Sequence, residues 1–283
     1  MIEKLAPQAM TARLGRTCYL LLGVYIASSC SLFAAPDWQA SVTKDPPGNF
    51  PPLRPLHGKY VFGWSGFTAA TAEVRFFRPD VDRCQVEGAG RTIGLARALW
   101  RYDVNYRAVA NIVSLRPIES NQADVYRAKK ITTHLLFNNT TVRRMRSETP
   151  PPASGQPKPK DWQFPNLFDL QTSVLYLRSQ PLQTKSVYRL VVYPATNAYL
   201  ATATVLGREK LPVRAGSYNA IKIDLQLQRI GKNLDLQPHR KFRRATIWVS
   251  DDSDRLVLRI EAQVFVGTVF TELQSVHFDE PQT

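Results

Sequence analysis

The alternation of apolar and polar residues at every second position is the feature that most constrains the fold of this chain. Across Ile221–Gln228, isoleucine and leucine occupy the odd positions, and Lys, Asp and Gln occupy the even ones. The same alternation runs through Leu256–Val266 and, more weakly, through Tyr199–Val205. A period of two gives each strand one apolar and one wet face. Strands of roughly ten residues or more favour a strongly bent sheet over short packed hairpins. The sequence therefore predicts a mainly β, single domain of long antiparallel strands, forming a curved sheet or barrel-like structure.

Two segments depart from this alternation and show helical spacing instead. They are Thr92–Tyr102 and Asp169–Ser179. In the second, Asp169 is placed to cap the helix and Pro181 to end it, and the apolar stripe comprises Leu170, Val174, Leu175 and Leu177. We expect one or two short helices packed on the sheet. The polar run Asp251–Asp254 supplies the residues of a tight reversal between two strands.

The first 35 residues have the layout of an export signal. A lead containing Lys4, Arg13 and Arg16 precedes an uncharged run with an apolar centre at Tyr19–Ala27. Small residues follow, and cleavage near Ala35 would release the rest of the chain. The sequence thus predicts a protein exported to the periplasm.

Two other interpretations of this segment remain open. Small residues directly precede Cys30, as in a bacterial lipoprotein signal over residues 1–29, which makes Cys30 a candidate for lipidation and membrane anchoring. Alternatively, the apolar run stays in place as an anchor, because about 20 residues can span a bilayer. All three interpretations place the bulk of the chain outside the inner membrane.

Two proline-rich tracts organise the rest. Residues 36–57 are dense in proline, which removes backbone donors, so we expect a linker there and a β-domain over residues 58–278. A second tract, at 149–165, predicts an exposed insert between two strand-rich halves. Cys84 is the one cysteine beyond the signal region. Without an internal disulfide, stability must come from the core, and a chain of this length can form one in a single domain.

The net charge of +14 is a second constraint. Residues 1–35 hold only three bases and one acid, so the domain itself stays basic. The bases either lie scattered on solvated strand faces or hold the protein near an anionic envelope surface. Short basic clusters occur at Arg143–Arg146 and Arg240–Arg244. Export excludes nucleic acid as the partner.

Motifs for catalysis or cofactor binding are incomplete. The four histidines lack a ligand at metal-binding spacing, and Ser65 lacks the second flanking glycine and the helix of a nucleophile elbow. Asp251–Asp254 lacks the glycine and distant glutamate of a calcium loop. Gly88–Gly90 lacks a following Lys-Ser/Thr pair, and we interpret it as a flexible entry to the first helix. We expect no metal, cofactor or catalytic residue, and an envelope hydrolase is the least favoured function.

The apolar inner surface of the sheet is then the candidate site. A curved sheet partly closed by helices can hold a lipid-like or hydrophobic ligand, or its aromatic rings can simply fill a core. The aromatic residues proposed to line such a pocket are Trp64, Phe76, Trp100, Tyr176 and Trp248. The alternative function is a periplasmic scaffold that binds an envelope protein through its basic outer face and sheet edges.

Several motifs, taken in order, resemble a bacterial family of exported proteins known as domain of unknown function 3108. They are Gly58–Tyr60 with Gly63-Trp64, Thr92–Leu95, Leu177–Leu182, Gly216–Lys222, and Ile247–Asp252 with Arg255. The resemblance covers Gly58 to about Leu273 and implies an exported, largely β domain without an established activity or site. The insert at 149–165 is longer than this resemblance leads us to expect.

Overall fold

The computed structural model describes residues 37–238, 244–264 and 267–279, and Trp38–Thr283 form one compact unit. The signal segment, Cys30 and most of the Arg240–Arg244 cluster lie outside the described residues. The described elements are β1 Leu56–Trp64, β2 Phe67–Phe77, β3 Arg83–Thr92, α1 Gly94–Leu99, β4 Tyr102–Asn111, β5 Pro117–Tyr126, β6 Lys129–Asn138, β7 Thr141–Thr149, β8 Lys160–Gln163, β9 Leu167–Phe168, α2 Leu170–Ser179, β10 Val187–Val192, β11 Tyr199–Val213, β12 Gly216–Ile230, β13 Leu236–Pro238, β14 Arg244–Ser250, β15 Val257–Gln263 and β16 Thr268–Phe278.

All strands belong to one sheet, which confirms the predicted mainly β fold. From β1 the chain meanders through β2 to β8, each strand antiparallel to the one before. The second half returns so that β16 pairs with the other edge of β1, followed by β15, β14, β12, β11, β10 and β9. The β9–β10 pair is parallel, and β13 pairs with β12 outside this path. Strands β11 and β12 have 15 residues each, as long as the alternation indicated.

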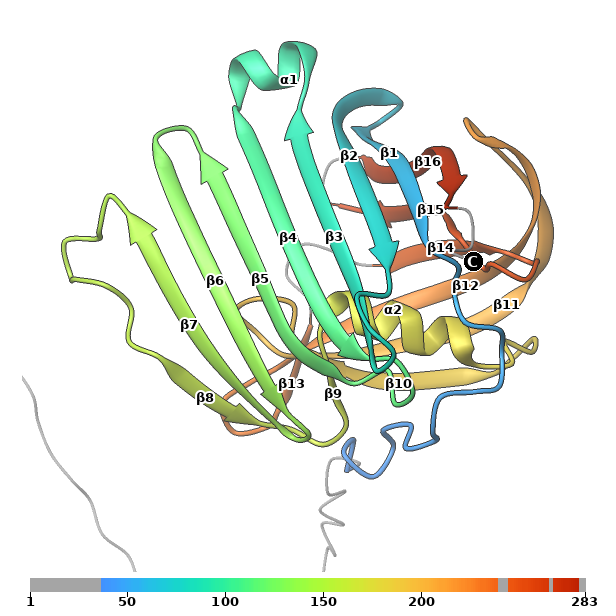
Figure 1. Cartoon of the computed structure of the whole chain (residues 1–283), viewed down its shortest axis with the longest axis horizontal. Helices are drawn as coiled ribbons and strands as arrows, with labels where there is room; N and C mark the ends of the chain where they lie inside the picture. Colours follow the sequence, from blue (N-terminus) through green and yellow to red (C-terminus); the bar gives the residue numbers. More distant parts are fainter. Residues whose placement is uncertain (1–36, 239–243, 265–266, 280–283) are drawn as a thin grey trace, which may run out of the picture. The chain divides into compact units, whose positions relative to one another are not determined.

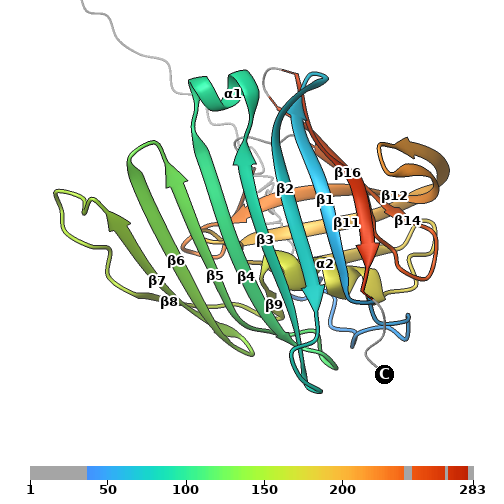
Figure 2. The same cartoon turned by 45° about the horizontal axis from the view of Figure 1, so that its top comes forward.

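The sheet curves so that its two halves face each other, with α2 between them (Figures 1 and 2). The register defines the two faces of β1–β6. Leu56, Phe76, Val86 and Ala108 pair in one row, and three of the four are buried, so this row marks the inner face. The adjacent row begins at His57, faces the opposite side, and marks the outer face.

The two edges of the sheet meet through side chains. Leu135 and Val142 of the first half share a buried cluster with Leu167 and Val191 of the second. Phe164 and Tyr193 belong to the same cluster and Trp162 packs against it, and the centroids of these three rings are 6.5 Å apart. The sheet is therefore barrel-like in shape although its hydrogen-bond ladder does not close.

Helix α2 begins as its sequence predicted. The Asp169 carboxylate accepts from the Thr172 amide at 2.7 Å, and the Thr172 hydroxyl accepts from the Asp169 amide at 3.1 Å, which is a capping box. The expected apolar stripe is wrong in part. Leu170 and Val174 are exposed, because the helix packs through the face that holds Tyr176.

Two of the family-like motifs meet at the C-terminal end of α2. The Arg178 guanidinium donates to the Asp254 carbonyl at 2.7 Å, and the Arg255 guanidinium donates to the Arg178 carbonyl at the same distance. Arg255 also lies 3.4 Å over the Phe50 ring, and Arg54 binds the Asp254 carboxylate at 2.6 Å. We call these five residues the arginine cluster. It joins α2, the β14–β15 turn and the segment before β1, and it confirms the predicted turn at Asp251–Asp254.

The proline-rich segment before β1 contains no helix or strand among its described residues, but it does not stand off from the sheet as a linker would. Val42 is buried, and the Thr43 amide donates to the Arg189 carbonyl at 2.9 Å. The Tyr176 hydroxyl donates to the Asp45 carbonyl at 2.7 Å. Proline prevents regular structure here, but its carbonyls and neighbouring side chains still pack and accept hydrogen bonds.

The region around Gly88 differs from expectation. The helix predicted at Thr92–Tyr102 is only the six-residue α1, and Gly88–Gly90 lie inside β3 rather than in a helix entry. A Cβ at Gly88 would approach a ring atom of Tyr106 to 2.0 Å. Glycine is therefore needed at this position for close packing across the strands.

Candidate functional site

The five aromatic residues proposed as pocket lining do not come together. Phe76 and Trp248 belong to one buried cluster, and Tyr176 belongs to another. Trp64 and Trp100 lie on the surface, at the end of the sheet away from α2. Within the described residues, three of these rings fill the core and two lie at the far rim of the sheet.

The inner face between these two regions carries a different set of side chains. Beyond the buried row, one row holds Val74 and Tyr106, and the next holds Ala72, Val104 and Ile131. All five are half-buried. Apart from Asp124, which lies between Val104 and Ile131 in the second row, this part of the inner face is apolar and only partly covered.

Two glycines on this surface let aromatic rings lie close against the backbone. The Tyr106 ring lies directly over Gly88 of the neighbouring strand, in the space that a Cβ would occupy. On β1 the ring of Tyr60 lies close over Gly58, 3.2 Å from where a Cβ would stand. The rings of Tyr60 and Tyr106 thus lie over neighbouring glycines. Together with Tyr102 and the neighbouring Val74 and Val104 they form a surface that we call the tyrosine floor.

The floor ends in an apolar hollow beneath α1. The hollow has a volume of about 500 Å³ and is lined by Thr92, Ala96, Leu99, Trp100 and Tyr102. The Thr92 hydroxyl donates to the Trp100 carbonyl at 3.0 Å and accepts from the Tyr102 amide at 3.1 Å, which fixes the turn after α1. Trp100 therefore does line an apolar hollow, although without the other four predicted rings.

The phenols of the floor are neutral at physiological pH. Burial raises the pKa of Tyr106 to about 12. Burial also raises the pKa of Tyr60, and burial together with the hydrogen bond to Asp124 raises that of Tyr102. The phenols of the floor therefore present no charge to a ligand, and the carboxyl group beside them is that of Asp124, which accepts from the Tyr102 hydroxyl.

The β5–β7 side of the same face is polar. Gln122 and Thr133 continue the row of Tyr106, and Arg146 follows them. Arg146 lies 2.9 Å from the Glu148 carboxylate, which also binds Lys129. Hydrogen bonds from Lys129 and Arg146 hold the pKa of Glu148 below its usual range. The inner face is thus amphipathic, with an apolar side on β1–β4 and two bases around one carboxylate on β6–β7.

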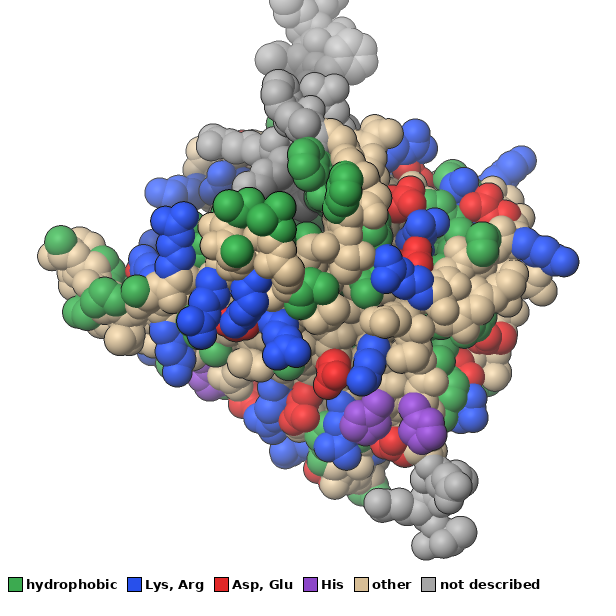
Figure 3. All heavy atoms as spheres, turned by 90° about the horizontal axis from the view of Figure 1, so that it is seen from above, with side chains coloured by type: hydrophobic (Ala, Val, Ile, Leu, Met, Phe, Trp, Pro, Cys, Tyr) green, Lys and Arg blue, Asp and Glu red, His purple; other side chains and the backbone are tan. Residues whose placement is uncertain are grey.

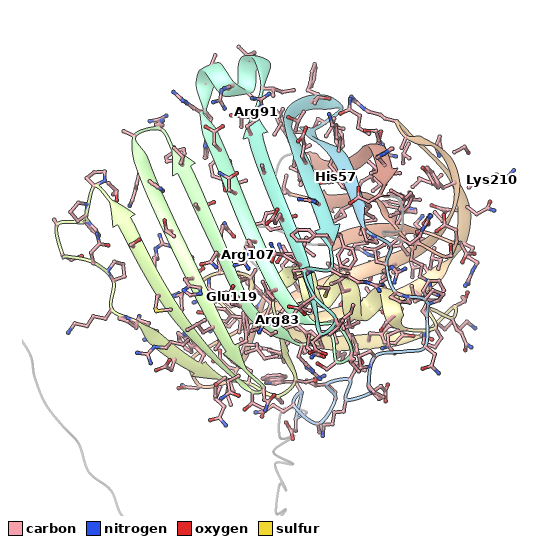
Figure 4. The ribbon with its side chains drawn as sticks, viewed as in Figure 1. His57, Arg83, Arg91, Arg107, Glu119 and Lys210 are labelled. Carbon is pink, nitrogen blue, oxygen red and sulfur yellow. The ribbon has the colours of Figure 1, made fainter. Side chains whose placement is uncertain are left out.

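The outer face of the same strands carries a second hollow, of about 550 Å³, across β1–β6. Most of the residues that line it are polar or charged, and Lys59 pairs with Glu73 at 3.4 Å. Arg107, which also lines it, binds Glu119 at 2.8 Å; both are labelled in Figure 4. Because these charges pair with one another on an open face, we place the candidate site on the inner face.

The tyrosine floor was not predicted, because Thr92–Tyr102 has helical spacing and Gly88–Gly90 was interpreted as a flexible entry to that helix. The available signal was the alternation of Tyr102, Val104, Tyr106 and Ala108 with polar residues, apart from Val109, along β4. In the part of the chain that the structure describes, no helix has the length and apolar character to cross a membrane. No group of three His, Cys, Asp or Glu side chains could hold a metal ion there either.

Comparison with known proteins supports the fold. No curated protein matches the chain. The crystal structure of a beta-barrel-like protein of domain of unknown function DUF1849 from Brucella abortus has a TM-score of 0.54. It is 9% identical and covers 81% of this chain and 99% of that one. A structure from Parabacteroides distasonis, described as a "putative lipoprotein", has a TM-score of 0.34 at 9% identity, covering 83% of this chain and 100% of that one.

The family assignment rests on sequence. The model described as protein of unknown function DUF3108 matches residues 59–274, which extend from β1 into β16. This match confirms the resemblance carried by the motifs, and the chain belongs to the DUF3108 family.

Proposed function

We propose that this domain is a non-enzymatic component of the cell envelope that binds a lipid-like, amphipathic molecule on its inner face. The observation that carries the proposal is the neutral tyrosine floor, half-covered and continuous with the apolar hollow beneath α1. An apolar chain would lie over Val104 and Tyr106 and reach the hollow at Trp100. A polar head group would lie toward the Arg146, Lys129 and Glu148 side chains.

The test uses neighbouring residues that point to opposite faces of β4. Val104→Glu places a carboxylate on the tyrosine floor, whereas Asn105→Glu places the same group on the outer face. We expect Val104→Glu to lower the affinity for a fluorescent fatty acid by about tenfold or more, because a desolvated charge opposes apolar binding. Asn105→Glu should change it less than about twofold.

Equal effects of the two substitutions, or a wild-type protein that binds neither the fatty acid nor a lysophospholipid, would overturn the proposal. Mass spectrometry of lipids extracted from the natively purified protein gives an independent readout. We also propose export to the periplasm, with Cys30 as the candidate site of lipid attachment. The intact mass of the membrane-extracted protein tests this point, because cleavage near Ala35 would remove Cys30 altogether.

A further inference from the structure

The end of the sheet away from α2 exposes large apolar side chains. We call these residues the apolar rim: Trp64, Phe67, Leu95, Leu99 and Trp100. Between 47% and 78% of each is exposed. Phe67 follows the β1–β2 turn, the leucines lie on α1, and the β2–α1 contact brings the two segments together. Figure 3 looks onto this end and shows hydrophobic side chains gathered among Lys and Arg side chains.

Folding does not account for the rim. Helix α1 has only six residues, none of them buried, and its N-cap Ile93 makes no side-chain hydrogen bond. So short a helix is not stable by itself in water. It is held at its base, where Arg97 donates to the Thr92 carbonyl at 3.3 Å and binds Asp103 at 2.8 Å. Leu95 and Leu99 therefore contribute little to the core and remain available for an external partner.

Basic side chains surround the rim. Arg91, Arg101, Arg127 and Lys130 are exposed at the ends of β3–β6, and Figure 4 places Arg91 beside α1. Of the acids at these strand ends, Asp103 is bound by Arg97 and lies 3.8 Å from Arg101, Glu148 is bound by Lys129 and Arg146, and Asp124 accepts from the Tyr102 hydroxyl at 2.5 Å. The exposed bases leave a net positive charge around the apolar rim, which complements an anionic surface.

We propose that the apolar rim docks on the surface of an anionic lipid bilayer. Aromatic and leucine side chains at the tip enter the boundary between head groups and acyl chains, and the surrounding bases contact phosphate groups. The proposal goes beyond ligand binding and stands without it. If both hold, the hollow beneath α1 opens at the membrane surface, because Leu99 and Trp100 belong to both the hollow and the rim.

The test measures co-sedimentation of the full-length protein with phosphatidylglycerol–phosphatidylcholine vesicles at low salt. Phe67→Ser with Leu95→Ser removes two rim residues that do not line the hollow. The matched control is Val81→Ser with Val113→Ser, which removes two equally exposed residues from turns at the opposite ends of β2–β5. We expect the rim variant to bind at least about tenfold more weakly, and the control to bind like the wild type.

A second pair of variants tests the charge. Replacing Arg91, Arg127 and Lys130 by Gln should lower the affinity for anionic vesicles by about a hundredfold, since each base contributes about a factor of five at such a surface. Replacing the exposed Lys160, Lys185 and Lys232 by Gln removes the same charge elsewhere and should have a much smaller effect. Residues 1–36 are common to all variants, so binding by that segment does not distinguish them.

Equal binding to anionic and neutral vesicles, or equal losses in the rim and control variants, would overturn the proposal. So would a concentration-dependent dimer that Phe67→Ser with Leu95→Ser abolishes, because a second copy would then cover the rim. Fatty-acid binding without vesicles should survive that double substitution. Failure of one assay is therefore distinguishable from failure of the other.

Discussion

The two ends of the sheet use similar side chains in opposite ways. At the α2 end, aromatic and aliphatic residues fill buried clusters, and the arginine cluster donates to the carbonyls of Pro51, Arg178 and Asp254. At the rim, residues of the same kind are exposed and surrounded by bases. The α2 end thus has the character of a folding core, and the rim that of an interaction surface.

This difference shows that two of the family motifs serve the fold. Arg178 and Arg255 come from the Leu177–Leu182 and Ile247–Asp252 motif regions. Arg178 donates to the Asp254 carbonyl of the turn, and Arg255 donates to the Arg178 carbonyl of α2, so each motif fixes the backbone of the other. Such motifs identify the fold without identifying a site. Function is better sought where exposed apolar residues serve no purpose in folding.

The largest expected difference in stability is between two substitutions in β2. Phe76→Ala should lower the free energy of unfolding by about 3–5 kcal/mol, because it leaves a cavity in the core. Phe67→Ala, at the exposed end of the same strand, should change it by less than about 0.5 kcal/mol. Urea denaturation measures both. Similar losses would show that the rim is part of the core and would remove the distinction between the two ends.

Substitution in the arginine cluster should cause the next largest loss of stability. Arg255→Met retains much of the side-chain volume but leaves the carbonyls of Arg178 and Pro181 without their donor. We expect a loss of about 3 kcal/mol of unfolding free energy, since buried acceptors lose a charged partner. Arg127→Met, at the rim, is the control and should be nearly neutral. A loss below about 1 kcal/mol at Arg255 would mean that the cluster does not stabilise this end.

The buried Asp169 makes the stability of the α2 end depend on pH. Burial raises its pKa to about 6 from 3.8, so the folded state holds a proton that the unfolded state has released between these values. The contribution of this group is therefore greatest below pH 4 and is lost as pH rises through 6. Relative to Asp169→Asn, which can still cap α2, the wild type should lose about 2–3 kcal/mol between pH 4 and pH 7. Parallel stability curves for the two proteins would contradict the buried, proton-binding carboxyl.

The smallest loss of unfolding free energy is expected for a substitution in the tyrosine floor. Gly88→Ala displaces the Tyr106 ring and should cost about 1–2 kcal/mol. In a Tyr106→Ala background the same change should cost less than about 0.5 kcal/mol, because the clash is gone. A double-mutant cycle by urea denaturation measures this coupling. Additive costs would show that the ring does not lie over the glycine.

Predictions from sequence succeeded where the cause is local. The alternation at Ile221–Gln228 corresponds to the long strand β12, Asp169 caps α2, and Asp251–Asp254 form the turn between β14 and β15. The predictions failed where a contact between residues on different strands determines the local structure. Gly88 is indistinguishable from a loop glycine until Tyr106 of the next strand lies over it.

By itself the sequence determined that the chain forms a curved, mainly β sheet, because a period of two commits each strand to one apolar and one polar face. Only the tertiary structure decided which aromatic rings are core and which are surface. Phe76 and Phe67 lie on the same strand and have the same chemistry, but α2 and the second half of the sheet cover only one end of β2. The number of neighbours that reach a side chain depends on the path of the whole chain, and no local pattern encodes it.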